Sequence, residues 1–253
     1  MKSVGIDGCR SGWVAACYED EEILLFKTIE EIVKHYGNGY ELLIDIPIGL
    51  ASEDCKIRNC EKEARAALQG TRKSSVFSVP CREALHARSY PEKKHLEDYS
   101  KTNEVNKNIL GKGLSLQSYS IMPKIKEVDD FLILNPEIRK RLKESHPEIA
   151  FQFLNYKELD YNKKSKEGIK ERLKILTKLK KQSETLYHKA VANYLRKEVA
   201  KDDILDALCL TLTKHLVLTQ PDNYTMASFP SDPLHDEEGI EMAIYYGSRK
   251  LNK

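Results

Sequence analysis

Four aspartates stand where the surrounding sequence is apolar, and their types and spacing suggest chemistry. Asp7 ends the first apolar run, and Asp45 lies within the continuous apolar run of residues 40–50. Asp203 and Asp206 are three residues apart, so on a helix they share one face. An unpaired buried carboxylate costs several kcal/mol. Such acids therefore need partners.

A cluster of four or five carboxylates, with Glu148 as the further candidate, cannot stay fully ionised by itself. Either some proton is retained or cations bind. Hard oxygen ligands favour Mg²⁺ or Mn²⁺ over Zn²⁺. Two such ions about 4 Å apart activate a water molecule and stabilise the leaving oxygen of a phosphodiester. The acids therefore indicate phosphodiester hydrolysis with Mg²⁺ or Mn²⁺ as the cofactor.

Each acid also has a structural interpretation. Asp7 suits a turn before a glycine, and Asp203 suits the first turn of a helix. Asp45 can bond a backbone amide at a strand end, and Glu148 can form an ordinary salt bridge. Capping does not extend to Asp206, which lies past the first turn. These separate interpretations predict no relation between the sites, whereas a topology that puts all of them at one end of a sheet predicts a cluster.

Two basic residues are candidates for binding the phosphates of a substrate. Arg10 lies three residues past Asp7 and can reach a phosphate near the metal ions, although pairing with an acid explains it equally well. Lys124 extends the same surface or faces solvent. The GKGLS stretch at residues 111–115 lacks the P-loop spacing and favours a helix-entry loop. Trp13 alternates with apolar neighbours, which favours core packing over base stacking.

The first fifth of the chain predicts the elements that position these acids. Strands are predicted at residues 2–7, 12–18 and 22–28, the first two forming a hairpin. Thr28 then caps a short helix that stops at Gly37. Residues 40–50 are continuously apolar, which is typical of a strand buried on both faces at the centre of a sheet.

The rest of the chain is mostly helical. Helices are predicted at residues 60–68, 165–181, 184–199 and 202–218, and after the glycine loop toward residue 134. The helix at 202–218 is apolar on nearly every face, so it packs against the sheet. Residues 138–154 predict a strand that contains Glu148 and bends at Pro147, and residues 219–253 predict a loop and one last short element. We expect one domain, residues 1–253, with an insertion at about 51–125.

Composition excludes several classes of protein. Of the 253 residues 41% are hydrophobic and 32% are charged, as in soluble globular proteins. No run is long enough to span a bilayer and no signal-peptide pattern is present, so we expect no membrane association and a cytoplasmic location. The six cysteines have no CxxC spacing, so they indicate neither a zinc site nor a disulfide framework.

The net charge of +2 is unevenly distributed. Residues 163–201 contain thirteen Lys and Arg against four Glu. Such a run is usually the solvated face of a helix, and it becomes a polyanion-binding surface only where a polyanion site is argued independently. Together with the acids, the run makes nucleic acid, either DNA or RNA, the expected partner.

Five stretches carry a resemblance to a known family: GIDGCRSGWV, IDIPIGL, GKGLSLQSYSIMPKIKEVD, ESHPEIAF and DDILDAL. The order of elements, with an acid on the first strand, an acid on the fourth and D-x-x-D on the final helix, resembles the ribonuclease H-like fold and its RuvC-type branch. More closely, the chain resembles the DUF429 family of predicted nucleases from residue 5 to about 210. The resemblance implies an α/β fold, with a mixed five-stranded sheet flanked by helices and a helical insertion, and a metal-dependent nuclease.

The resemblance also implies the metal ligands Asp7, Asp45, Asp203 and Asp206. His146 and Glu148 match a family motif without an assigned role. Two other functions stay open. Actin-like and sugar-kinase-type ATP-binding proteins share the core fold and often start with a Gly-Asp-Gly phosphate turn. This chain is short for two such halves, and it has no second D-x-G turn. A non-catalytic nucleic-acid-binding protein of the same fold fits the basic run equally well.

Overall fold

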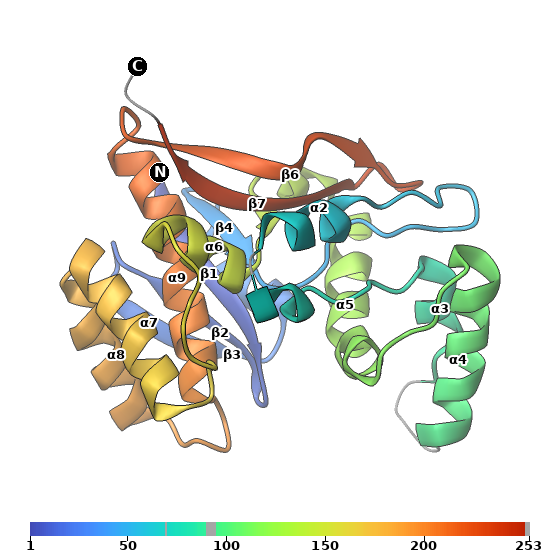
Figure 1. Cartoon of the computed structure of the whole chain (residues 1–253), viewed down its shortest axis with the longest axis horizontal. Helices are drawn as coiled ribbons and strands as arrows, with labels where there is room; N and C mark the ends of the chain where they lie inside the picture. Colours follow the sequence, from blue (N-terminus) through green and yellow to red (C-terminus); the bar gives the residue numbers. More distant parts are fainter. Residues whose placement is uncertain (69, 90–94, 251–253) are drawn as a thin grey trace.

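The computed structural model describes residues 1–68, 70–89 and 95–250. A five-stranded sheet forms the centre, in the order β3 (Glu22–Phe26), β2 (Gly12–Cys17), β1 (Lys2–Cys9), β4 (Tyr40–Ile44) and β5 (Leu142–Glu144). A two-stranded sheet, β6 (Tyr224–His235) with β7 (Glu241–Arg249), lies beside it (Figure 1). The predicted α/β fold with a mixed five-stranded sheet is confirmed.

A hairpin and a third strand form the antiparallel half of the central sheet. β1 pairs antiparallel with β2, with Asp7 opposite Val14, and β2 pairs antiparallel with β3. Gly12 begins β2 with a φ of +133°, and a Cβ there would lie 2.2 Å from the carbonyl oxygen of Phe26. Only glycine therefore fits this turn without displacing β3.

Helix α1 (Ile29–Tyr36) connects the antiparallel half to the parallel half. The Thr28 hydroxyl accepts a hydrogen bond from the Glu31 backbone N–H at 3.2 Å, and the chain leaves the helix through Gly37 with a φ of +53°. β4 then pairs parallel with β1, and β5 pairs parallel with β4. The predicted order of three strands, a capped helix and a further strand is confirmed.

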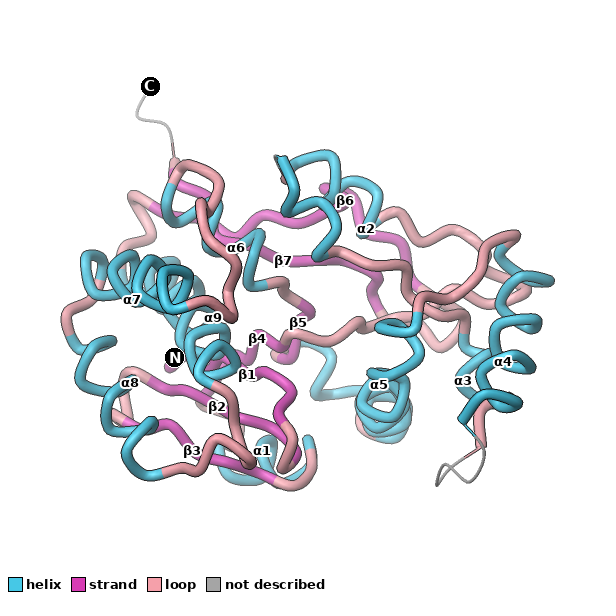
Figure 2. The backbone as a smooth tube through the Cα atoms, turned by 60° about the horizontal axis from the view of Figure 1, so that its bottom comes forward, coloured by secondary structure: helices cyan, strands magenta, loops and turns pink. Residues whose placement is uncertain are grey.

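Helices cover both faces of the central sheet (Figure 2). The remaining helical segments are α2 (Cys60–Ala67), η1 (Gly70–Ser75), α3 (Arg82–Ala87), α4 (His95–Leu110), α5 (Leu116–Leu134), η2 (Pro136–Lys140), α6 (Pro147–Asn155), α7 (Lys166–Leu179), α8 (Gln182–Asn193) and α9 (Lys201–Thr219). α1 and α5 pack on one face, and α9 with α7 and α8 on the other. None of the helices in the described ranges is both long and apolar enough to cross a membrane.

The alternation of β1 assigns its residues to these two faces. Val4 and Ile6 are fully buried in the core beneath α1 and α5. Gly5 lies on the opposite face, where a Cβ would come within 2.1 Å of the carbonyl oxygen of Ala207 in α9. α9 therefore lies directly on the backbone of β1. Asp7, two residues further along the strand, lies on the same face.

Two predicted strands end earlier than expected. The strand expected at residues 40–50 ends at Ile44, so Asp45 follows β4 instead of lying within it. The strand expected around Glu148 ends at Glu144 as β5, so the placement of Glu148 in a strand is wrong. Pro147 begins α6, because proline suits the first helical position, where no backbone N–H is needed.

The prediction of a loop and one short element for residues 219–253 is also wrong, apart from 251–253, which lie outside the described residues. The region contains the antiparallel pair β6 and β7. β6 contains Pro230 and Pro233, so its sequence predicts a loop, and in the structure the strand is largely half-exposed. β7 buries Met242 and Ile244 in a cluster with residues of α2 and α6. Tertiary packing of β7 therefore stabilises the pair, which local propensity alone does not predict.

Candidate metal centre

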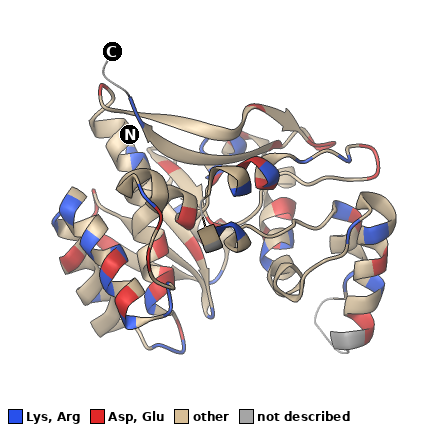
Figure 3. Ribbon diagram, viewed as in Figure 1, with Lys and Arg blue, Asp and Glu red and all other residues tan. Residues whose placement is uncertain are grey.

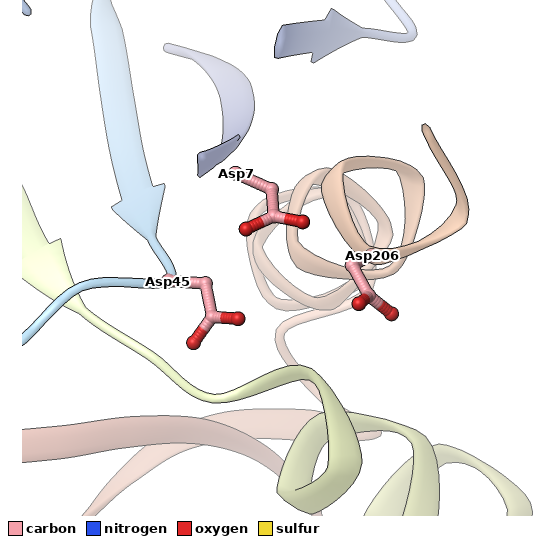
Figure 4. Close-up of side chains that lie close together, drawn as sticks. All are labelled: Asp7, Asp45 and Asp206. Carbon is pink, nitrogen blue, oxygen red and sulfur yellow. The ribbon is translucent and has the colours of Figure 1, made fainter. Parts of the chain in front are cut away.

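Three carboxylates from different elements meet at the carboxyl end of β1 and β4. One oxygen from each of Asp7, Asp45 and Asp206 lies within 4.8 Å of the others. Figure 4 shows the three side chains gathered around a common space. Asp7 belongs to β1, Asp45 follows β4, and Asp206 lies in α9. The structure thus brings together three of the five candidate acids.

The pairing of β1 with β4 brings Asp7 next to Asp45. The two strands are parallel with Ile6 opposite Ile44, so each acid follows a paired residue at the same end of the sheet. The backbone N–H of Asp45 donates to the carbonyl oxygen of Ile6 at 2.9 Å, which extends the ladder to the acid itself. The carboxyl ends of parallel strands are where sheets of this kind place their ligand sites.

Asp206 reaches the other two acids because α9 lies on the backbone of β1. Its residue is fully buried, with 0% of its surface exposed. One of its carboxylate oxygens, Oδ1, has no hydrogen-bond partner among the residues that the structure describes. Buried polar atoms nearly always have a hydrogen-bond partner or a bound ion, so we expect one at this oxygen. A bound cation would be such a partner.

Burial and mutual repulsion perturb the acids. Burial raises the pKa of the Asp7 carboxyl well above its usual value, and the charges of Asp45 and Asp206 raise it further. Burial also raises the pKa of Asp45, while the charges of His146 and Lys163 oppose this shift. Carboxylates this close can all be ionised only when positive charge is added. The arrangement therefore favours cation binding.

One cation of the chain already lies beside the acids. Lys163, in the connection between α6 and α7, has its Nζ 2.7 Å from Oδ2 of Asp206 and 4.0 Å from Oδ2 of Asp202. The charge of Asp206 is the main cause that raises the pKa of Lys163. One ammonium offsets only one of three carboxylates. The sequence does not predict this contact, because Lys163 is the first residue of the basic run and nothing in the run distinguishes it from the other cations.

Asp203 lies close to the three acids without belonging to the set. Its carboxylate accepts a hydrogen bond from the backbone N–H of Ala200 at 3.1 Å, which is the helix-start interaction considered above. Burial, followed by the charges of Asp202 and Asp206, raises the pKa of Asp203 to about 6. This bond uses Oδ2 alone and holds the Asp203 side chain against the start of α9.

Glu148 forms a salt bridge with a buried arginine. Its Oε1 pairs with Arg172, whose surface is 0% exposed, and its Oε2 lies 3.9 Å from Arg72. That second oxygen is buried without a hydrogen-bond partner among the described residues. The side chain also lines the same hollow as the three aspartates. Its strongest contact is the ion pair with Arg172.

The three aspartates line a hollow of about 500 Å³, which we call the acid pocket. Its cationic lining consists of Arg72, Lys124, Lys163 and Lys164. Its apolar lining consists of Ile46, Pro47, Val76, Phe77, Val79, Pro147, Ile121 and Ile244. The pocket therefore combines acids, surrounding cations and an apolar wall that includes one aromatic ring.

The structure separates the two basic candidates. Lys124 lines the acid pocket, and its ammonium donates to the carbonyl oxygen of Gly12 and lies 4.1 Å from the ring centroid of Trp13. Burial lowers the pKa of Lys124. Trp13 is fully buried in the core, as predicted. Arg10 is exposed and lines a second hollow instead of the acid pocket.

The two remaining motifs, ESHPE with His146 and GKGLS at residues 111–115, lie in different parts of the structure. His146 lines the acid pocket, with its Nε2 3.3 Å from the carbonyl oxygen of Ser75 and its Nδ1 buried without a partner among the described residues. Residues 111–115 lead into α5, where the Ser115 hydroxyl accepts from the Ser118 N–H at 2.9 Å. This is the predicted helix-entry loop.

The fold and the site together define an α/β protein whose mixed sheet carries three clustered aspartates at the carboxyl end of its parallel strands. The model of the family described as "Protein of unknown function (DUF429)" matches residues 5–234. The chain therefore belongs to the DUF429 family, as its motifs predicted. No curated protein and no solved structure matched the chain.

Proposed function

We propose that this protein is a metal-dependent nuclease that hydrolyses phosphodiester bonds of nucleic acid. The main support is the meeting of Asp7, Asp45 and Asp206 within 4.8 Å, with a buried oxygen on Asp206 that has no hydrogen-bond partner in the described part of the chain. A ligand set of carboxylates without His or Cys suits Mg²⁺ or Mn²⁺ better than Zn²⁺. Bound there, such an ion supplies an activated water molecule and stabilises the leaving oxygen.

Three groups near the aspartates would assist metal and substrate binding. The Gly8 backbone N–H donates to Oδ1 of Asp7 at 2.7 Å and so orients that carboxylate. Lys163 exchanges its bond to Asp206 for a contact with the substrate phosphate when the acids hold a cation. A two-metal site needs a further carboxylate, and Asp203 on the same helix is the nearest along the chain.

The acid pocket also suits one nucleotide unit of a substrate. Its volume of about 500 Å³ lies within the usual range for small-ligand sites. Arg72, Lys124 and Lys164 present positive charge to phosphate oxygens. Phe77 and Ile121 provide apolar surface on which a base can stack. The pocket thus accommodates both the charged and the planar parts of a nucleotide.

A cleavage assay tests the proposal. The purified chain is incubated with single-stranded, double-stranded and branched DNA and with RNA, in Mg²⁺, in Mn²⁺ or in EDTA. We expect cleavage only with metal, and its loss in Asp7→Asn and Asp206→Asn. Asp222→Asn changes an exposed aspartate outside the acid pocket and is the matched control. Cleavage by Asp7→Asn at the wild-type rate would refute the proposal.

The same preparations distinguish the two alternative functions. Metal-dependent hydrolysis or saturable binding of ATP, without cleavage of nucleic acid, would favour an ATP-binding protein of the actin-like or sugar-kinase type. Nucleic-acid binding without turnover under any metal would favour a non-catalytic binding protein.

A further inference from the structure

A second hollow, of about 780 Å³, lies beside the acid pocket, and we call it the basic groove. Six cationic side chains line it: Arg10, Lys164, Lys166, Arg196, Lys197 and Lys201. They come from the turn between β1 and β2, from the start of α7 and from the segment that leads into α9. Figure 3 shows Lys and Arg along these segments. All six residues are exposed.

The six cations have no acidic partners among the residues that the structure describes. Within the described ranges, none of their side chains forms an ion pair or a hydrogen bond. Among the described residues that line the groove, the one acid is Asp202, which is 6% exposed and lies 4.0 Å from the Nζ of Lys163. Like charges around a concave surface create a positive potential that attracts anions. The charge of the groove therefore favours the binding of an anion of high charge.

The start of helix α9 does not add to this potential. Asp202 and Asp203 lie in its first turn, Asp202 lines the groove, and Asp203 accepts a hydrogen bond from the backbone N–H of Ala200. The charges of these two acids offset the positive end of the helix dipole. The positive potential of the groove therefore comes from the six cationic side chains.

The basic groove continues into the acid pocket. Lys164 lines both hollows. On α9, Asp202 lines the groove and Asp206 lines the pocket, and four residues of helix span about 6 Å. One strand of a B-form duplex rises about 3.4 Å per nucleotide. The groove therefore begins about two nucleotides from the acids.

We propose that the basic groove binds the backbone phosphates of a nucleic-acid strand whose phosphate about two nucleotides further along lies at the acid cluster. The inference rests on the proposed nuclease function for the nature of its substrate. A strand of regularly spaced phosphates matches both the unpaired cations and the continuity of the two hollows. Because the lining consists mostly of cations, it contacts the backbone and positions the strand without reading its sequence.

The test uses Arg196→Gln/Lys197→Gln, which changes two exposed cations of the groove. Binding of a labelled single-stranded DNA is followed by fluorescence anisotropy over a range of salt concentrations, in EDTA so that no cleavage occurs. We expect the dissociation constant to rise about tenfold, and the slope of log affinity against log salt to fall by about 1.4. In Mg²⁺ we expect a raised KM with an unchanged kcat.

Lys101→Gln/Lys107→Gln removes the same charge from α4, on the opposite side of the molecule from α7 and α9, and is the matched control (Figure 1). Unchanged binding by the groove variant, with a wild-type protein that binds and cleaves, would overturn the groove and leave the nuclease proposal standing. Equal weakening by both double variants would also overturn the groove, because net charge alone would then explain the loss. A wild-type protein that neither binds nor cleaves nucleic acid would overturn both proposals.

Discussion

The ammonium of Lys163 lies 2.7 Å from the buried carboxylate of Asp206, at the place where we propose that a divalent cation binds. This ion pair joins the segment before α7 to α9. A lysine and a metal ion that neutralise the same carboxylate compete for it. If a cation binds there, we expect the Lys163 side chain to move away from Asp206.

Lys163→Gln tests this competition. We expect the free energy of unfolding of the metal-free protein to fall by about 1–3 kcal/mol, because buried Asp206 loses its ion-pair partner. The lysine side chain is 35% exposed, which keeps the cost below that of a fully buried pair. We also expect Mg²⁺ to raise the melting temperature more than in the wild type. Lys164→Gln is the control, and an unchanged response to Mg²⁺ would rule out competition.

Gly5→Ala tests the contact that brings Asp206 to the other acids. A Cβ would lie 2.1 Å from the carbonyl oxygen of Ala207 and 2.3 Å from the backbone nitrogen of Thr211, so α9 must shift away from β1. We expect a loss of about 3 kcal/mol in urea unfolding and a weaker response to Mg²⁺. Gly39→Ala is the control, since a Cβ there meets nothing within 4 Å. Equal stability of the two variants would contradict the structure.

Asp203→Asn tests the pH dependence of stability. The pKa of Asp203 is about 6 in the folded protein and about 3.9 in an unfolded chain. Between these values the folded state binds more protons, so the contribution of Asp203 to stability is present below about pH 4 and is lost as the pH rises through about 6. The variant should therefore gain stability relative to the wild type over this range. Chemical denaturation at several pH values measures the difference, and a constant difference would disprove the shift.

Glu148→Gln separates a structural role from metal binding. The guanidinium of Arg172 is fully buried and loses its carboxylate partner in this variant. We expect a loss of about 3 kcal/mol, with an unchanged melting-temperature shift on addition of Mg²⁺. The double variant Glu148→Gln/Arg172→Met should recover part of the loss, because no buried charge is then left unpaired. A lost Mg²⁺ response in the single variant would instead make Glu148 a ligand.

Local signals in the sequence predicted most of the first fifty residues. These signals are the helix cap at Thr28, the helix end at Gly37 and the hairpin turn at Gly12. Each depends on interactions within a few residues, so it can be predicted without the rest of the chain. The predictions that failed depend on distant packing. β6 is a strand because β7 lies beside it, and Pro147 begins a helix at a position where a strand bend explains the proline equally well.

The sequence by itself assigned Asp7 and Asp45 to two apolar strands, so it predicted that the two acids meet if those strands are neighbours. The structure supplies that condition, because β1 and β4 pair in parallel and end at the same edge of the sheet. The sequence also placed Asp203 and Asp206 on one helix face, but not which of them meets the other acids. Only the tertiary structure decided which of the two meets the other acids, because the close contact of α9 with Gly5 fixes how the helix is rotated about its axis. The same holds for the cation beside Asp206. Lys163 reaches the acids through the packing of α6, α7 and α9, and spacing along the chain carries no information about that distance.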